Sequence, residues 1–236
     1  VGIAEAHAVT FAAGMATRGF RPVVAIYSTF LQRAYDQILI DVCMQNLPVI
    51  FAIDRAGNVG NDGETHHGIF DISYLSHMPN MTLLAPADGQ ELVEMMRYAL
   101  TCTGPVAIRY PRGAATQLHL PQRKPFAGKS IVLKQGKDAE IFAVGNMVSV
   151  ALAVSERLAL LGCDIGVVNV AQVSPPDTEA VFGALQRTKR IVTLEDNVLK
   201  SGFGETANSI VLAAGGGQTL NIGWPQAVIE HGNTED

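Results

Sequence analysis

The sequence predicts an α/β protein of two domains, each with a mostly parallel sheet flanked by helices. Three observations predict this fold. Apolar runs rich in β-branched residues alternate with helical patterns along the chain. A polar stretch with two prolines, residues 112–128, interrupts the alternation and reads as a linker, and the alternation then resumes. Because 48% of the 236 residues are hydrophobic, each domain has enough apolar side chains for a core.

The first domain is expected to span residues 1–120. Its strands are predicted from short β-branched apolar runs at 22–27, 49–53, 81–85 and 106–110. Its helices are predicted from apolar residues spaced three and four apart at 5–18, 29–45 and 88–101. Asp88 is expected to cap the last of these helices, and Glu91 three residues later fits a capping box.

The second domain is expected to span residues 128–236 and to repeat the strand–helix alternation. Its strands are predicted at 140–144, 165–170, 190–194 and 220–222. Its helices are predicted at 147–161, 176–186 and 204–214. Alternation of this kind favours parallel strands that helices cover on both faces.

Composition excludes several classes of partner and suggests a compartment. The net charge is −5 and no basic run is present, which argues against nucleic acid and anionic membranes. The longest apolar runs are too short to span a bilayer. Three distant cysteines, Cys43, Cys102 and Cys163, fit neither a disulfide framework nor a zinc site, so a cytoplasmic protein is expected. Since the first residue is Val1 rather than methionine, the chain is expected to be a piece of a longer polypeptide.

The loop after the strand at 49–53 is the strongest candidate for a site. Loops that follow strand ends in α/β proteins are where ligands bind. Within fifteen residues this loop carries Asp54, Arg55, Asp62, Glu64, His66 and His67. Adjacent histidines in an extended segment point to opposite sides, so they do not suit one metal ion. Asp62 and His66 could ligate a divalent ion, but no further residue completes the set, and a hydrogen-bonded acid–base pair of the two suits their spacing better. No metal ligand is expected in the chain.

Glu5 and Arg33 each allow two interpretations. Glu5 either complements the dipole of the first helix or is a shielded carboxylate that exchanges a proton. Tyr27 and Phe30, at a strand end, could flank a flat ring with Arg33 behind it. Alternatively, Arg33 forms a simple surface ion pair with Asp36.

Two arginines close the first domain. Arg109 lies at the end of the strand predicted at 106–110 and Arg112 follows it, and an arginine at such a strand exit suits a phosphate or a carboxylate. The alternative is a pair of solvated loop arginines.

Several strings together resemble one known family. They are Gly-Ile-Ala-Glu at 2–5, Tyr-Ser-Thr-Phe-Leu-Gln-Arg-Ala-Tyr-Asp-Gln at 27–37, Asp-Arg-Ala-Gly at 54–57, Thr-His at 65–66, Phe-Asp at 70–71 and Arg-Tyr-Pro-Arg-Gly at 109–113. With them the chain resembles the transketolase superfamily, and most closely its 1-deoxy-D-xylulose-5-phosphate synthase family. The resemblance implies a pyrimidine-binding domain at 1–120, without its N-terminal part, and a transketolase C-terminal domain at 128–236.

The resemblance also implies a cofactor site. In this family, the glutamate that matches Glu5 contacts N1′ of the thiamine diphosphate aminopyrimidine and acts in catalysis. The aromatic residue that matches Phe30 packs on the same ring, and Tyr27 and Arg33 would line the pocket. Ala6 departs from the pattern, because the family usually has glutamine there.

A substrate site is implied in the same way. The positions matching Arg55 and Arg112 hold the phosphate of D-glyceraldehyde 3-phosphate, and Tyr27 borders the substrate. Asp62 and His66 would act in proton transfer and substrate positioning. The implied reaction condenses pyruvate with glyceraldehyde 3-phosphate and releases CO₂, at the head of non-mevalonate isoprenoid biosynthesis.

Part of the family's machinery lies outside this sequence. The diphosphate-binding domain, with the Gly-Asp-Gly motif that binds Mg²⁺, normally precedes this region in the same polypeptide. We therefore expect a homodimer that needs that domain, with the isolated chain inactive. Two other interpretations are a ketoacid dehydrogenase β subunit, which would use a lipoyl acceptor, and a non-catalytic chain that only binds a partner.

Overall fold

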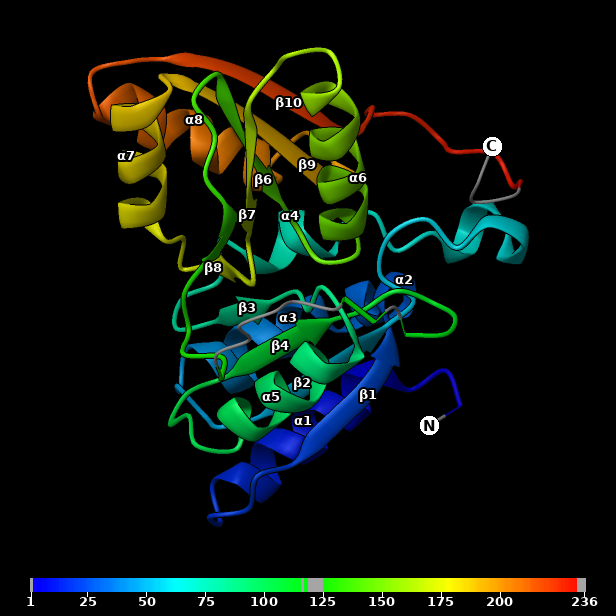
Figure 1. The fold of residues 1–236 in the computed structure, drawn as a ribbon. Coiled ribbons are helices and arrows are strands. Elements are labelled where there is room, and N and C mark those ends of the chain that lie inside the picture. Colours follow the sequence, from blue (N-terminus) through cyan, green and yellow to red (C-terminus); the bar gives the residue numbers. More distant parts are fainter. Residues whose placement is uncertain (1, 116, 119–124, 233–236) are drawn as a thin grey trace.

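A computed structural model describes residues 2–115, 117–118 and 125–232 as two α/β domains, one above the other in Figure 1. The strands of the lower domain are β1 (Val23–Tyr27), β2 (Ile50–Asp54), β3 (Thr82–Leu84) and β4 (Val106–Arg109). Its helices are α1 (Glu5–Ala16), α2 (Ser28–Leu31), α3 (Tyr35–Gln37), α4 (Asp71–Leu75) and α5 (Gly89–Ala99). Single 3₁₀ turns lie at Gln32–Ala34, Gly60–Asp62 and Glu64–His66, and a π-helical turn at Ile38–Cys43.

The lower sheet brings the ends of three strands to one edge. Its order is β1-β2-β4-β3-β8, and β1 to β4 run parallel. Tyr27 is the register partner of Asp54, and Ile53 is the partner of Arg109. Since the carboxyl ends of parallel strands face the same way, the residues that follow β1, β2 and β4 meet at this edge.

The fifth strand of the lower sheet comes from the second half of the chain. Strand β8 (Gln172–Ser174) pairs antiparallel with β3, with Leu84 opposite Gln172. This strand is not predictable from the sequence, because three residues are too few for a periodic signal. The two halves of the chain are therefore joined by a shared sheet as well as by packing.

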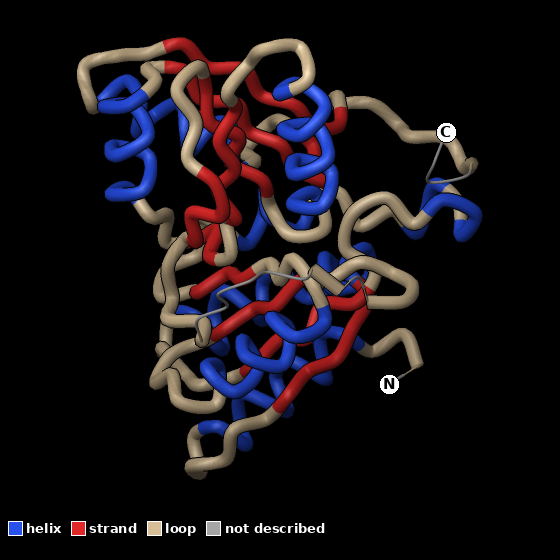
Figure 2. Tube along the Cα trace, in the orientation of Figure 1, coloured by secondary structure: helices blue, strands red, loops and turns tan. Residues whose placement is uncertain are grey.

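The upper domain has a second five-stranded sheet in the order β10-β9-β6-β7-β5. Figure 2 shows its strands in red with helices on either side. Its strands are β5 (Ile131–Lys134), β6 (Ala139–Ala143), β7 (Ile165–Asn169), β9 (Arg190–Val198) and β10 (Gln218–Trp224). Its helices are α6 (Met147–Ala159), α7 (Thr178–Arg187) and α8 (Phe203–Ala213). Only β5 runs antiparallel to its neighbour in this sheet. The predicted fold class, two α/β domains with mostly parallel sheets, is confirmed.

Three details differ from the predicted elements. The helix predicted at 29–45 is broken into short α, 3₁₀ and π turns, in a segment whose β-branched Ile38, Ile40 and Val42 disfavour a regular α-helix. Strand β9 continues four residues beyond its predicted end, and Val198 pairs with Trp224 of β10. The sequence also gave no indication of α4 and β5. The predicted linker at 112–128 falls partly on residues 116 and 119–124, which lie outside the described residues.

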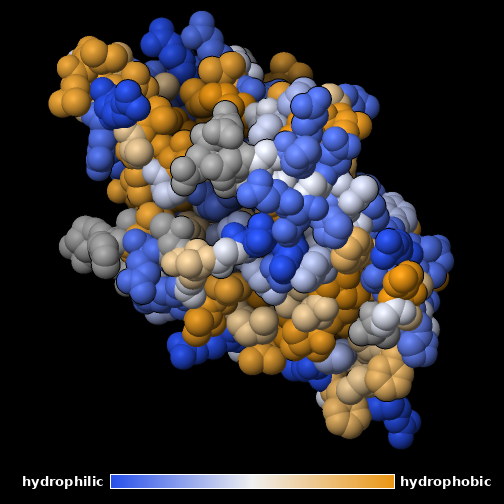
Figure 3. Space-filling view, turned by 90° about the vertical axis from the view of Figure 1, so that its right-hand side faces the viewer, coloured by the Kyte–Doolittle hydropathy of each residue, from blue (hydrophilic) through white to orange (hydrophobic). Residues whose placement is uncertain are grey.

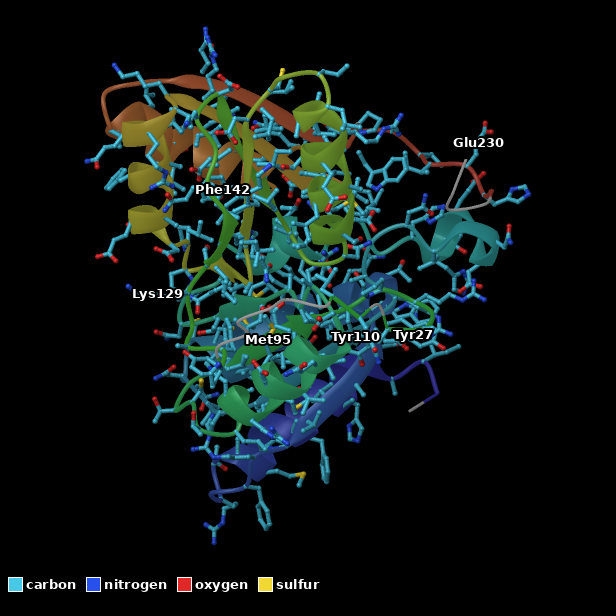
Figure 4. All side chains as sticks on the ribbon, viewed as in Figure 1. Tyr27, Met95, Tyr110, Lys129, Phe142 and Glu230 are labelled. Atoms are coloured by element: carbon cyan, nitrogen blue, oxygen red, sulfur yellow. The ribbon has the colours of Figure 1, made fainter. Side chains whose placement is uncertain are left out.

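The cores of the two domains are continuous. One hydrophobic cluster contains Phe51 of the lower sheet, Val173 of β8 and Phe142 of the upper sheet. Figure 4 shows Phe142 inside the upper domain, and Met95 inside the lower one. In the described part of the chain, every helix is too short or too polar to cross a bilayer.

Candidate active site

Glu5 begins helix α1 and is nearly buried, with 8% of the residue exposed. Its Oε1 accepts a hydrogen bond from Nη1 of Arg33 at 3.0 Å. Among the described residues, the Glu5 carboxylate is hydrogen-bonded through Oε1 alone. The position at the start of a helix agrees with the dipole interpretation, and the burial agrees with the shielded carboxylate. Glu5 therefore has one oxygen held and one available.

An aromatic pair lies beside this carboxylate, where β1 ends and α2 begins. The rings of Tyr27 and Phe30 are stacked, with centroids 5.5 Å apart and planes 14° apart. The Arg33 guanidinium lies 4.9 Å from the Phe30 ring centre, so Arg33 joins Phe30 to Glu5. The alternative ion pair of Arg33 with Asp36 is not among the contacts of the described residues. Figure 4 shows Tyr27 on the side of the molecule from which the next loop projects.

The loop after β2 starts with a strained arginine. Arg55 has a φ of +57°, a conformation that residues other than glycine seldom adopt. The Asp54 carboxylate holds it there, accepting the Arg55 backbone N–H at 2.7 Å and Nη1 at 2.6 Å. The guanidinium then lies over the Tyr27 ring, 3.9 Å from its centre. Arg55 is thus fixed against the aromatic pair.

Asp62 lies between two arginines. Its carboxylate is 3.5 Å from Nε of Arg55 and 3.2 Å from Nη1 of Arg112. The structure thus brings together Arg55 and Arg112, the two arginines to which the family resemblance assigns the substrate phosphate, from two different loops. Among the described residues Asp62 is engaged by these arginines and forms no hydrogen bond with His66, so the acid–base pair of Asp62 and His66 stays a prediction.

His66 contacts the aromatic pair instead. Its ring meets the Phe30 ring edge-on at 5.4 Å, and its Nδ1 lies 3.1 Å from Oγ1 of Thr65. The neighbouring His67 is buried, and its Nδ1 accepts the backbone N–H of Val59 at 3.2 Å. The two histidines therefore have different surroundings. Among the described residues, no group of three or more His, Cys, Asp or Glu side chains could hold a metal ion.

Arg109 does not belong to this site. It is 3% exposed, and its Nε donates to both carboxylate oxygens of Asp71, at 3.0 and 3.1 Å. The strand exit thus places Arg109 against a carboxylate of the protein itself and leaves Arg112 at the loop surface. Arg112 is 47% exposed.

A buried polar group at the end of β9 was not predicted from the sequence. Glu195, Asp196 and Asn197 are all buried. Burial raises the pKa of Glu195 to about 7, although the backbone N–H groups of Gly204 and Phe203, which it accepts at 2.8 Å each, act in the opposite direction. A run of three polar residues after an apolar strand was the available signal.

Figure 3 views the side from which the Asp54–His66 loop projects, where hydrophilic residues gather in the middle.

The chain is similar to known proteins in both of its domains. The transketolase pyrimidine-binding domain family matches residues 1–117, and the transketolase C-terminal domain family matches residues 128–236. A 1-deoxy-D-xylulose-5-phosphate synthase of Pelotomaculum thermopropionicum is 52% identical over 99% of this chain. The enzyme of the same name from Clostridium tetani is 52% identical over 100% of the chain. The chain spans only 37% and 38% of the length of these two relatives.

Two solved structures share the fold. A split-gene transketolase, described as an inactive beta4 tetramer, has a TM-score of 0.89 and 28% identity, and the alignment covers 98% of this chain and 75% of that one. A transketolase from Campylobacter jejuni has a TM-score of 0.73 at 20% identity, with 93% and 33% of the two chains covered. On the two domain matches and the synthase relatives, this chain belongs to the transketolase family.

Proposed function

We propose that this chain is the pyrimidine-binding and C-terminal part of a thiamine-diphosphate-dependent transferase. Its reaction is the condensation of pyruvate with D-glyceraldehyde 3-phosphate to 1-deoxy-D-xylulose 5-phosphate and CO₂. The names of the relatives that are 52% identical support this reaction. The observation that carries the proposal is the nearly buried Glu5 carboxylate, with one oxygen available and with Arg33 linking it to the Phe30 ring.

This arrangement fits an aminopyrimidine. A carboxylate shielded from water can share a proton with a ring nitrogen, so Glu5 is assigned to hold and move the proton at N1′. Phe30 is partly exposed and is assigned to pack against the pyrimidine ring. Arg33 keeps Glu5 oriented, and Tyr27 supports Phe30 from behind. When bound, thiamine diphosphate supplies the carbon centre at which pyruvate loses CO₂.

The two arginines favour a phosphorylated acceptor. Arg55 and Arg112 converge on the Asp62 carboxylate, so their guanidinium groups already lie close enough together to hold one anionic group. A sugar phosphate provides such a group, whereas the lipoyl arm used by ketoacid dehydrogenases does not. We assign the acceptor phosphate to Arg55 and Arg112. Asp62 and His66 are assigned to substrate positioning and proton transfer beside it.

The remaining parts of the site belong to a diphosphate-binding domain. That domain would supply the Mg²⁺ ligands, in the same polypeptide or as a second chain, within a homodimer. Two findings support a site shared with a further domain. The chain spans only 37% of the length of a synthase relative, and it is similar to a split-gene transketolase. Three free cysteines, of which Cys43 is buried, agree with a cytoplasmic location. The chain without that domain is expected to be inactive.

Replacing Glu5 tests the proposal. The first step is denaturing mass spectrometry of the purified sample, which reveals whether a diphosphate-binding domain is present. The complete assembly is then assayed with thiamine diphosphate, Mg²⁺, pyruvate and glyceraldehyde 3-phosphate. Glu5→Gln should lower turnover at least ~100-fold, because the amide cannot exchange the proton. Glu64→Gln, an exposed carboxylate of the adjacent loop, is the matched control and should keep full activity. Turnover retained in Glu5→Gln would refute the assigned role.

A further inference from the structure

The upper domain reaches into the base of the active-site loop. At the end of β9, the backbone N–H of Val198 donates to the Ile69 carbonyl at 2.9 Å. Nδ2 of Asn197 donates to Oγ of Ser73 at 3.0 Å. Ile69 directly follows the loop that carries Asp62 and His66, and Ser73 lies just beyond it in helix α4. Strand β9 is therefore bonded to the segment that returns from this loop.

Asp196 makes the most extensive of these contacts. Its Oδ1 accepts the backbone N–H of Asn58 at 3.0 Å and Nε1 of Trp224 at 2.7 Å. Its Oδ2 accepts Nδ2 of Asn146 at 3.1 Å, and its backbone carbonyl accepts Nη2 of Arg109 at 3.0 Å. Both oxygens of a carboxylate that is 6% exposed are thus bonded, and one of the donors belongs to the loop.

The loop is shaped to accept this carboxylate. Gly57 has a φ of +83°, and a Cβ there would lie 2.0 Å from Oδ2 of Asp196. Gly57 also exchanges two backbone hydrogen bonds with Gly68, each 2.8 Å long, and these close the loop at its base. Only glycine leaves room for Asp196 at this closure.

We propose that Asp196 is a positioning residue, through which the C-terminal domain sets the place of Asp62 and His66. It touches neither of them, but it anchors the closed base of the loop that carries them. This gives the C-terminal domain a part in the chemistry in addition to packing. The proposal rests on the proposed function for its effect on turnover, but the anchoring itself is measurable on the chain alone.

Trp224 makes the anchoring measurable. It is the only tryptophan in the sequence, and its indole donates directly to Asp196. In Asp196→Ala, the tryptophan emission should shift to longer wavelength, and amide hydrogen exchange at residues 57–68 should accelerate at least ~10-fold. Gly57→Ala should produce both effects without touching Trp224, because the new methyl group displaces the carboxylate.

Gly19→Ala is the matched control. Gly19 has nearly the same φ, +86°, but a Cβ there meets open space. It should carry a similar backbone strain while leaving the emission and the loop exchange unchanged. Exchange at 57–68 that matches the wild type in both Asp196→Ala and Gly57→Ala would overturn the proposal. If Asp196→Ala does not fold, Gly57→Ala against Gly19→Ala decides the question.

Activity of the complete assembly provides the second readout. Asp196→Ala should lower kcat at least ~10-fold, with thiamine diphosphate binding unchanged. Asp196→Asn should restore part of the loss, because Asn146 can turn its amide to present an oxygen. If the wild type lacks synthase activity, the proposed function fails, while the emission and exchange results still test the anchoring. An unchanged kcat with accelerated loop exchange would refute the positioning role alone.

Discussion

Arg55 depends on its neighbour Asp54 for both its backbone and its side-chain position. The carboxylate accepts the Arg55 N–H and one guanidinium nitrogen, and so stabilises a left-handed conformation that costs on the order of 1–3 kcal/mol. In the complete assembly, Asp54→Ala should therefore raise the KM for glyceraldehyde 3-phosphate about tenfold, which is ~1.4 kcal/mol of lost preorganisation. Steady-state kinetics with each substrate varied in turn measures this.

The KM for pyruvate provides the internal comparison for Asp54→Ala. It should change little, because Arg55 is assigned to the acceptor phosphate. Asp54→Asn keeps an oxygen for the Arg55 N–H and should have a smaller effect than Asp54→Ala. A lower KM for the acceptor in Asp54→Ala would mean that Asp54 competes with the phosphate for Arg55.

Helix α5 shows how a cap predicted from sequence acquires a second role. Oδ1 of Asp88 accepts the Glu91 N–H at 2.8 Å, as the capping pattern predicts, and Oδ2 accepts the N–H of Leu118 at 3.2 Å. Asp88→Ala should lower the free energy of unfolding by about 1–2 kcal/mol. Asp88→Asn, which retains a cap acceptor, should lose less. Urea denaturation measures both, and a loss within ~0.3 kcal/mol for Asp88→Ala would contradict the assigned cap.

Elements with a local signal were predictable, and elements without one were not. The four parallel strands β1 to β4 and the Asp88 cap follow from apolar periodicity and short-range polar patterns. Strand β8 has three residues and depends on β3, which is about ninety residues earlier in the chain. Tertiary contacts of that kind leave no periodic trace in the sequence.

At the scale of the whole molecule, the site also has parts with a local signal in the sequence and parts that depend on tertiary contacts. The motifs at Glu5, Tyr27–Phe30 and Arg55 were identifiable singly, since each lies at a strand or helix end. That Asp62 would pair with two arginines and leave His66 to Phe30 depends on how two loops meet at the sheet edge. The anchoring by Asp196 depends on contacts between two domains, and the polar run at 195–197 marks the residues without indicating their partners.

Glu195 makes the stability of the chain sensitive to pH. Burial raises the pKa of its carboxyl from the ordinary 4.5 to about 7, so between these values the folded chain keeps a proton that the unfolded chain has lost. This contribution to stability is complete below about pH 4.5 and is lost as the pH rises through about 7. A shift of this size corresponds to ~3 kcal/mol.

Substituting Glu195 isolates that contribution. Glu195→Gln lacks the titrating proton, so its free energy of unfolding should fall less than that of the wild type between pH 5 and pH 8. Urea denaturation gives the free energy of unfolding of both chains at both pH values. The change between the two pH values is then compared between the chains, and the contributions of all other titrating groups cancel. Any hydrogen bond that glutamine loses to the N–H groups of Phe203 and Gly204 is the same at both pH values, so it does not affect this comparison. Equal pH dependence in the two chains would mean that Glu195 titrates near its ordinary value despite its burial.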